Sequence, residues 1–416
     1  MTRTVLSCAL VLGSVLTSLA NEPEDKSVWP QWRGPNRDCI VEGPVWPDRL
    51  PEVMKPVWRV ELGDSYSGPI VTSDKVFVTE TAGKKYEVVR ALDRATGEEI
   101  WKTQWEGAMS VPFFARQNGS WIRSTPTWDG ERLYVGGIRG VMVCLNAENG
   151  EEIWRKDFVK EFSASMEQFG FVCSPVVLGD YLYSQCCAGL LKIDKKTGKT
   201  VWRAMKESGG MMGGSFSSPV IATIAGKEQL IAQSRSTLAG IDFETGQTLW
   251  SKPIPAFRGM NILTPTIIGD SVFTSSYQQG AWMYDVKPLN TGMSPKEKWT
   301  SRSRAYMSSP IVIDNHIYMH LQNQRVTCID ATTGETKWTT SDRFGKYWSM
   351  VAQGKKILAL DERGELLLIN ANPEKFDLVD RRKISKQSTW AHLAVAGDTI
   401  FVRELKAQAV YKWAAR

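Results

Sequence analysis

Histidine is scarce in this sequence, and the motifs that mark common catalytic and metal sites are missing. Three histidines occur in 416 residues, and two of them, His316 and His320, are four apart in a run typical of a β-strand. At ~3.3 Å per residue in a strand, the two rings would lie about 13 Å apart, too far to share a zinc ion. No His-Glu-x-x-His, Cys-x-x-Cys, Gly-x-Ser-x-Gly or calcium-loop motif occurs. The sequence therefore predicts no metal site and identifies no catalytic residue, although a catalytic triad is defined in space rather than by a motif.

Charge of one sign does not accumulate along the chain. Lys and Arg number 51 against 45 Asp and Glu, a formal net charge of +6, and the two kinds alternate. A nucleic-acid-binding protein normally gathers its Lys and Arg in a run or patch. The sequence therefore gives no indication of a nucleic-acid partner.

Long apolar runs are missing beyond the amino terminus. Residues 1–20 combine Arg3 in a basic start, an apolar run over 5–19 and small residues at Ser18 and Ala20, the pattern of a cleaved signal peptide. The mature protein is expected to be exported, either periplasmic or secreted, with no transmembrane span after cleavage. An uncleaved anchor and lipid attachment at Cys8 are alternatives, the second disfavoured because Cys8 lies inside the apolar run.

Cysteine is also sparse, and its pairing is open. Removal of the signal peptide leaves six cysteines, an even number in an exported protein, which permits disulfides without showing any. They are Cys39, Cys144, Cys173, Cys186, Cys187 and Cys328.

One eleven-residue pattern returns along the chain. Its first copy is Ala91-Leu-Asp93-Arg-Ala-Thr96-Gly97-Glu-Glu-Ile-Trp101. The Asp can cap its own turn, the Gly can take a positive φ, and the Trp can bury a large ring worth roughly 4–6 kcal/mol. In further copies the position of Asp93 is held by Asn146, Asp194, Asp242 and Asp330. The predicted docking rings are Trp58, Trp101, Trp154, Trp202, Trp250, Trp299 and Trp338.

A second pattern precedes each hairpin: small residues, often a proline, then an apolar run. The prolines are Pro69, Pro126, Pro175, Pro219, Pro265 and Pro310, and two copies, at Trp348-Ser-Met350 and Trp390-Ala-His392, lack the proline. The mean spacing is ~46 residues, within the range of four-stranded propeller blades. We label the strands of each blade A to D from the centre outward.

These repeats predict an all-β, eight-bladed β-propeller with four-stranded antiparallel blades. The expected blades span about 64–106, 120–158, 173–206, 215–254, 262–301, 306–340, 347–384 and 390–416. The last has no strand D, so residues 55–63 around Trp58 are expected to complete it and close the ring, which removes exposed sheet edges. The predicted organisation is a signal peptide (1–20), an irregular Pro-rich lead-in (21–54) and the propeller (55–416). Blade five carries an insertion over 287–296 in its C–D turn, and blade seven has no docking Trp.

The pattern Ala-x-Asp-x-x-Thr-Gly-x-x-x-Trp resembles the tryptophan-docking motif of quinoproteins. The chain is similar, over roughly residues 29–416, to the pyrroloquinoline-quinone-like (PQQ-like) β-propeller repeat proteins, and Trp29-Pro-Gln-Trp-Arg-Gly-Pro35-Asn resembles the lead-in of secreted bacterial members. That group includes the quinoprotein alcohol dehydrogenases and the propeller lipoprotein of outer-membrane protein assembly. The motif is architectural, so the resemblance implies the fold and does not choose an activity.

The D–A connections are expected to carry the binding site. They lie on the same face as the B–C turns, and several are long and rich in aromatic, Met and Arg residues, a composition typical of recognition surfaces. Packing of these side chains on one another is the alternative interpretation. The candidate binding residues are Phe113, Phe114, Arg116, Trp121, Met211, Met212, Arg258, Arg304, Tyr306 and Trp348.

Adjacent cysteines on the same face provide a second hypothesis. Quinoprotein alcohol dehydrogenases carry a disulfide between adjacent cysteines that stacks on the quinone, and Cys186-Cys187 resembles that pair. By this resemblance the cofactor would be PQQ with calcium, and Arg116, Arg258 and Arg304 could pair the quinone carboxylates. Glu167 and Asn261 lie in suitable loops, but the full calcium set of those enzymes has no match. The alternative is that one cysteine points into the blade and the other toward solvent or another cysteine, since neighbouring side chains alternate along a strand.

Three functions follow from these patterns. The favoured one is an exported, non-catalytic propeller that binds a protein or another macromolecule through the D–A connections and needs no cofactor. The first alternative is a PQQ-dependent quinoprotein dehydrogenase that oxidises an alcohol or sugar. A hydrolase or lyase built on a propeller is the remaining alternative.

Overall fold

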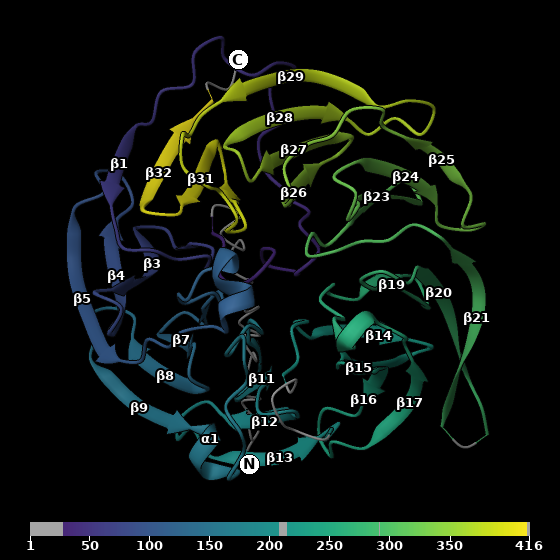
Figure 1. The fold of residues 1–416 in the computed structure, drawn as a ribbon, viewed down its shortest axis with the longest axis horizontal. Helices are drawn as coiled ribbons and strands as arrows, with labels where there is room; N and C mark the ends of the chain where they lie inside the picture. Colours follow the sequence, from purple (N-terminus) through teal and green to yellow (C-terminus); the bar gives the residue numbers. More distant parts are fainter. Residues whose placement is uncertain (1–27, 208–213, 291, 414–416) are drawn as a thin grey trace, which may run out of the picture.

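The computed structural model of the chain describes residues 28–207, 214–290 and 292–413. Eight four-stranded antiparallel sheets stand around one axis, and Figure 1 shows them end-on. The predicted fold class is therefore confirmed. The predicted signal peptide lies outside the described residues. No helix among those that the structure describes is long and apolar enough to cross a membrane.

The strands of each blade follow one another along the chain, from the centre outward. Blades one to four consist of β2 (Ile70–Val71), β3 (Lys75–Ala82), β4 (Tyr86–Asp93) and β5 (Glu99–Glu106); β6 (Thr127–Trp128), β7 (Arg132–Gly137), β8 (Val141–Asn146) and β9 (Glu152–Asp157); β10 (Val176–Leu178), β11 (Tyr181–Gln185), β12 (Leu190–Asp194) and β13 (Thr200–Ala204); and β14 (Val220–Ile224), β15 (Lys227–Gln233), β16 (Thr237–Ile241) and β17 (Thr248–Pro253). Blades five to eight consist of β18 (Thr266–Ile268), β19 (Ser271–Ser275), β20 (Ala281–Pro288) and β21 (Met293–Ser301); β22 (Ile311–Ile313), β23 (His316–His320), β24 (Val326–Asp330) and β25 (Thr336–Thr339); β26 (Trp348–Gln353), β27 (Lys356–Asp361), β28 (Glu365–Asn370) and β29 (Asp377–Lys383); and β30 (Ala394–Ala396), β31 (Thr399–Glu404), β32 (Ala407–Lys412) and β1 (Trp58–Glu61).

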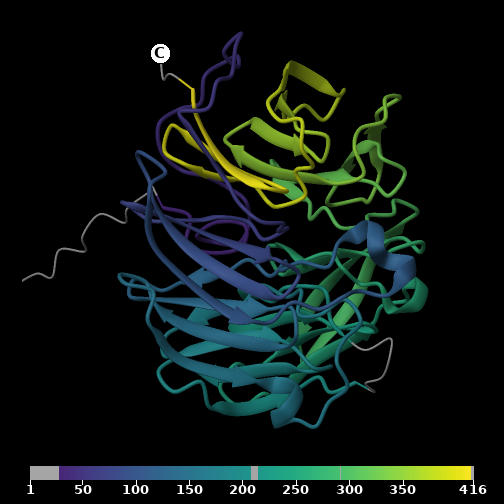
Figure 2. The same ribbon diagram turned by 60° about the vertical axis from the view of Figure 1, so that its left-hand side comes forward.

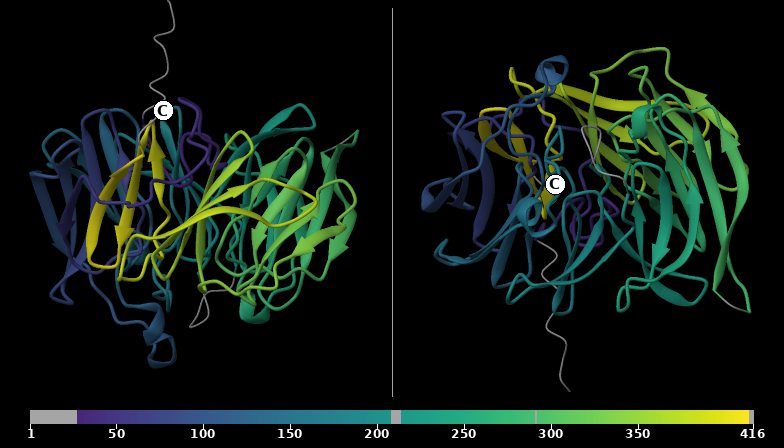
Figure 3. Two further views of the ribbon diagram at one scale, coloured as in Figure 1. Left: turned by 90° about the horizontal axis from the view of Figure 1, so that it is seen from above. Right: turned by 60° about the horizontal axis from the view of Figure 1, so that its bottom comes forward.

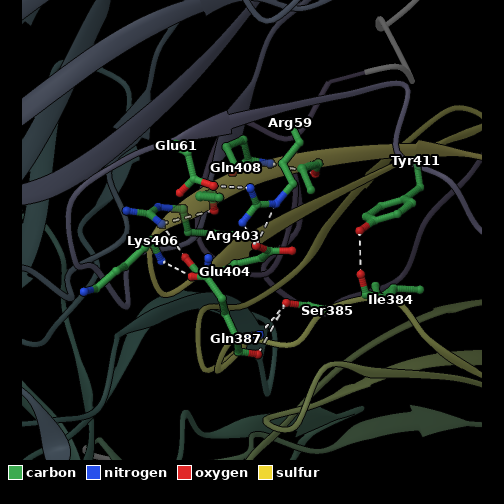
Figure 4. Close-up of polar contacts among 12 residues, drawn as sticks. Arg59, Glu61, Ile384, Ser385, Gln387, Arg403, Glu404, Lys406, Gln408 and Tyr411 are labelled. Atoms are coloured by element: carbon green, nitrogen blue, oxygen red, sulfur yellow. Dashed lines mark hydrogen bonds and ion pairs between the residues drawn. The ribbon is translucent and has the colours of Figure 1, made fainter.

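The ring is closed as the sequence predicts, by the first strand of the chain. β1 pairs antiparallel with β32, in a register that places Trp58 opposite Val410, and the purple and yellow strands lie side by side in Figure 1. Polar contacts support the junction (Figure 4): Arg59 Nη2 lies 2.6 Å from a carboxylate oxygen of Glu404. The buried Arg403 donates to the carbonyl oxygens of Gly63 and Thr79, which ties blade eight to blade one.

Every docking tryptophan except Trp250 lies on the turn of the next blade. The ring of Trp101 in blade one covers Gly150 in blade two, where an added Cβ would lie 2.5 Å from the ring, and its Nε1 donates to Ala147 O at 3.1 Å. Gly150 also has a φ of 76°, so the turn needs glycine for two reasons. The same arrangement places Trp58 on Gly97, Trp154 on Gly198, Trp202 on Gly246 and Trp299 on Gly334. The turn glycine of one blade is thus the docking site for the tryptophan of the preceding blade.

Blade five departs from this arrangement. The predicted insertion at 287–296 does not form an irregular loop, because most of it extends β20 and β21 into a long hairpin. Among the described glycines, the ring of Trp250 in blade four lies against Gly240 of its own blade and not against a glycine of blade five. Trp250 remains buried but donates instead to the side-chain oxygen of Gln229 in its own blade, at 2.7 Å.

The lead-in forms a plug in the central channel. The plug, residues 29–41, is the purple segment at the middle of Figure 1 and is seen obliquely in Figure 2. Trp29 N donates to Val71 O and Val41 N donates to Ala352 O, each at 2.8 Å, near the A–B turns of blades one and seven. Between these points the chain turns inward with Arg33 and Arg37, both at positive φ.

Two buried arginines fix the tip of the plug. Arg33 Nη2 donates to Pro310 O at 2.6 Å in blade six. Arg37 donates to Ser174 O and Pro175 O in blade three, at 3.0 and 2.9 Å. Both side chains are at most 4% exposed. The plug therefore joins opposite sides of the ring through charge-assisted hydrogen bonds to backbone carbonyls.

Candidate binding site at the centre of the loop face

The propeller has two different faces. The A–B and C–D turns lie on one, and the B–C turns and D–A connections lie on the other, which we call the loop face. The loop face carries η1 (Phe113–Asn118), α1 (Phe158–Glu161) and η2 (Phe257–Gly259). Figure 3 shows the disc from its edge, with η1 projecting to one side.

A cavity of about 190 Å³ lies on the axis of the loop face. All eight D–A connections contribute to it, and the plug contributes Trp32. The lining residues are Trp32, Tyr66, Asn118, Arg123, Phe169, Val172, Ser174, Phe216, Ser218, Met260, Ile262, Thr264, Tyr306, Met307, Ser308, Ser309, Tyr347, Trp348, Ser349, Trp390 and His392. The convergence of every connection on one hollow makes it the candidate site of the molecule.

The repeat register decides which side chains line the cavity. The residue three before the proline lines the cavity in each of the six blades that have the proline, and Tyr347 and Trp390 line it from the two blades that lack it. These residues are Tyr66, Arg123, Val172, Phe216, Ile262, Met307, Tyr347 and Trp390. The residue just before the proline also lines it in six blades: Ser174, Ser218, Thr264, Ser309, Ser349 and His392. Sequence reasoning missed most of these positions, although counting back from the prolines would have found them.

The small hydroxyl residues connect the blades. Thr125 N donates to Ser174 Oγ at 3.0 Å, and Ser174 N donates to Ser218 Oγ at 2.9 Å. Gly68 N donates to Thr125 Oγ1 in the same way, at 3.1 Å. These hydroxyls lie in a ring of inter-blade hydrogen bonds, and this role explains why small Ser and Thr residues occupy these positions.

The plug closes the inner end of the cavity. Trp32 Nε1 approaches Thr264 Oγ1 at 3.4 Å, and the ring meets His392 edge-on with centroids 4.9 Å apart. Burial lowers the pKa of His392 to about 4, so this imidazole is neutral at pH 7. The cavity is therefore open toward the loop face and floored by two uncharged rings.

Stacked aromatic rings form one wall. Tyr66 stacks on Trp390 with centroids 4.5 Å apart, and Tyr347 meets Trp390 edge-on at 3.8 Å. Tyr306 stacks on Tyr347 at 5.7 Å. Such rings give a rigid apolar surface with polar tips, as recognition sites use.

Arg123 is the one cation in the lining. Its guanidinium donates to Gly119 O at 2.8 Å and to Trp121 O at 3.3 Å. No carboxylate of the described residues lies within ion-pair distance of it. Burial lowers the pKa of Arg123 to about 10, which leaves it charged at neutral pH. A half-buried cation without a counter-ion attracts an anionic group.

The structure places the predicted binding residues in two groups. Tyr306 and Trp348 line the cavity, and Trp121 meets Tyr66 of the lining edge-on at 5.3 Å. The exposed residues outside the lining are Phe113, Arg116, Arg258 and Arg304. The Phe114 side chain, Met211 and Met212 lie outside the described residues.

The adjacent cysteines lie at the B–C turn of blade three. Cys186 and Cys187 are both buried and are free thiols whose sulfurs are 3.5 Å apart. The disulfide hypothesis therefore stays a hypothesis to be tested on the protein, and neither cysteine lines the cavity. Both side chains pack in one cluster with Phe158 and Leu191.

Counting thiols tests the state of this pair. All six described cysteines are buried and free, so we expect unfolding without reductant to release six reactive thiols and the native protein to release almost none. A count of four, with a peptide containing Cys186 and Cys187 lighter by two hydrogens in mass spectrometry, would instead establish the disulfide.

The residues of the cavity do not fit PQQ with calcium. The lining contains no carboxylate, and the described residues hold no group of three His, Cys, Asp or Glu side chains that could bind a metal ion. Glu167 accepts from Ala188 N, and Asn261 donates to Arg235 O and Ile254 O, so both hold loops in place. The volume is also below the roughly 300 Å³ at which pockets for larger ligands begin.

Reconstitution checks this conclusion directly. Protein incubated with PQQ and calcium, then passed through a desalting column, is expected to carry no quinone absorbance and to reduce no dye with alcohols or sugars. Stoichiometric quinone retained on the protein would contradict the fit described above.

A buried carboxyl under the loop face provides a test by pH. Glu87 accepts from Ile138 N at 2.6 Å and from Trp105 Nε1 at 2.8 Å, and burial raises its pKa to about 7. The folded state holds this proton more tightly than the unfolded chain. The contribution of Glu87 to stability is therefore full below about pH 4.5 and is lost as the pH rises through 7, by about 3 kcal/mol in total.

We expect Glu87→Gln to flatten the pH dependence of stability. Between pH 5 and 8 the wild-type protein should lose about 2 kcal/mol relative to this variant in urea denaturation. Glu374→Gln, at an exposed turn, is the control and should leave the slope unchanged. Parallel profiles for all three proteins would show that Glu87 does not titrate in this range.

The fold and its turns define a β-propeller of PQQ-like repeats. A family model described as "Outer membrane protein assembly factor BamB" matches residues 85–340, more than half of the chain, and the chain belongs to this family. The Outer membrane protein assembly factor BamB of Yersinia pestis is 22% identical over 363 residues, covering 83% of this chain and 86% of its own length. The protein of that name from Moranella endobia (strain PCIT) is 24% identical over 337 residues, covering 78% and 79%.

Solved structures share the fold. The crystal structure of BamB from Moraxella catarrhalis superimposes with a TM-score of 0.63 at 16% identity, covering 88% of this chain and 99% of that one. Quinohemoprotein alcohol dehydrogenase from Comamonas testosteroni gives a TM-score of 0.67 at 11% identity, covering 94% and 81%. At these identities the likeness concerns the fold alone.

Proposed function

We propose that this protein is a non-catalytic propeller of the cell envelope that binds a protein partner through its loop face. The observation that carries the proposal is the convergence of all eight D–A connections on one aromatic cavity. Family membership supports it, because the relatives are named as assembly factors for outer membrane proteins. The signal-peptide pattern of residues 1–20 fits export to a periplasm, where such a factor would act.

The chemistry of the cavity supports binding rather than catalysis. Its hydroxyls include Ser174 and Ser218, which accept backbone N–H groups of neighbouring blades. Its histidine, His392, packs against Trp32 and approaches Cys39 Sγ at 3.4 Å. No lining carboxylate is available as a general base, so the lining combines aromatic anchors with a single cation. That composition is suited to recognition.

Site-specific photocrosslinking in the native cell tests this function. A benzophenone amino acid replaces Phe113, which is 79% exposed on the loop face, and in a second strain it replaces Lys199 in a C–D turn on the opposite face. We expect protein adducts from position 113 and none from position 199. Adducts from both positions equally, or from neither, would overturn the proposal.

A further inference from the structure

The fold sorts charges that alternate along the sequence. The B–C turns and D–A connections of the loop face contain seventeen Lys and Arg and six Asp and Glu. The A–B and C–D turns of the opposite face contain six Lys and Arg and fourteen Asp and Glu. A chain of modest net charge is thus a disc with one basic and one acidic face, because turns of the same kind always lie on the same side.

On the loop face Lys85, Lys160, Arg363 and Lys406 form ion pairs, but the basic side chains between blades five and seven do not. Between blades five and seven the connections hold Arg302, Arg304, Arg325, Arg343 and Lys346, and the acidic residue among them is Asp342. Within the part of the chain that the structure describes, none of the five forms an ion pair. On the opposite face, by contrast, lysines bridge to Asp129, Asp180 and Asp314. Unpaired surface cations attract an anionic partner over about a Debye length.

The cavity adds an apolar anchor point to this basic face. An apolar cavity of about 150 Å³ can hold a benzene ring, so the 190 Å³ present here accommodates one aromatic side chain. Its wall of Tyr66, Tyr347 and Trp390 offers edge and face contacts to such a ring. Arg123 in the same lining offers a charge to an acidic group beside it.

We propose that the partner segment is an acidic polypeptide stretch that inserts one aromatic side chain into the central cavity, while its carboxylates lie over the unpaired arginines of the loop face. This inference rests on the proposed function and specifies the chemistry of the partner. The concave shape favours a peptide over an anionic membrane, because a flat lipid surface would leave the cavity and Arg123 unused.

Three synthetic peptides of about twelve residues test the inference with the full mature protein. The first alternates Glu, Asp and Ser around one central Phe, the second has Ala in place of Phe, and the third has Lys and Arg in place of the acids. Fluorescence anisotropy at 50 and 300 mM salt, as the chosen conditions, should show at least tenfold tighter binding of the first than of the second. The third should not bind, and the higher salt should weaken the first at least tenfold.

Matched charge reversals locate the contact. Arg302→Glu with Arg343→Glu changes two exposed loop-face cations, and Lys196→Glu with Lys199→Glu makes the same change in charge on the opposite face. We expect the first pair to weaken the Phe peptide at least tenfold and the second pair to change it less than twofold. Circular dichroism confirms that both variants remain folded.

Three outcomes would overturn the inference. They are equal binding of the Phe and Ala peptides, equal effects of the two charge reversals, and vesicles of phosphatidylglycerol that bind the protein through the same arginines while the peptides do not. If the peptides fail but position 113 still gives protein adducts in cells, the acidic-segment inference falls and the proposed function stands. If both fail, both are wrong.

Discussion

Replacing Trp101 with alanine is expected to lower the free energy of unfolding by about 3–5 kcal/mol. The ring is 9% exposed, covers Gly150 of the next blade and donates to Ala147 O. Its removal opens a cavity between two blades and leaves that carbonyl without its partner. Urea denaturation followed by circular dichroism measures the change, and Ile100→Ala, at a neighbouring side chain that is 47% exposed, should cost less than about 0.5 kcal/mol.

A double-mutant cycle separates docking from turn conformation. Gly150→Ala is costly in the wild type because Gly150 has a φ of 76° and because a Cβ would lie 2.5 Å from the Trp101 ring. In the Trp101→Ala protein the second cause disappears, and the remaining cost should fall to about 1 kcal/mol. Strictly additive changes would show that the two residues do not touch.

The repeat made the architecture predictable. The two repeating patterns together, Asp-Gly-Trp in the turns and the Pro-containing run before strand A, predicted eight blades and the closing role of Trp58, because each blade repeats the same local chemistry. The sequence did not reveal that the glycine of one blade receives the tryptophan of the previous blade. That contact joins residues about fifty apart, and a turn signal alone already explains the glycine.

The binding site was predicted less well, for a physical reason. Sequence reasoning chose long loops with conspicuous residues and so included Phe113 and Arg116, which the structure places outside the lining. A side chain lines the cavity when its residue lies close to the propeller axis. The residues closest to the axis are those just before strand A, the innermost strand of each blade. Tyr66 and Arg123 lie at this point of the repeat, so the register of the repeat was a better guide than loop composition.

The plug could not be predicted from the repeat, because it is not part of it. Trp29 and Trp46 of the lead-in are buried, each 2% exposed. The hydrogen bonds of Arg33 and Arg37, however, reach carbonyl groups far away in sequence. A single arginine in a Pro-rich segment carries no signal of such a partner, since only the closed ring brings the carbonyls to the axis.

Replacing Arg33 with alanine should therefore weaken the whole ring, by about 3–5 kcal/mol. The side chain is 2% exposed and donates to Pro310 O at 2.6 Å and to Cys39 Sγ at 2.9 Å. Alanine leaves Pro310 O without its partner, removes one of the two contacts of Cys39 Sγ and opens a void on the axis. Arg33→Met fills most of the void without restoring the hydrogen bonds and should lose less than the alanine variant, whereas exposed Arg116→Ala should change stability by less than about 0.5 kcal/mol. If the urea midpoint of unfolding of Arg33→Ala equals that of the wild type, the plug does not stabilise the ring.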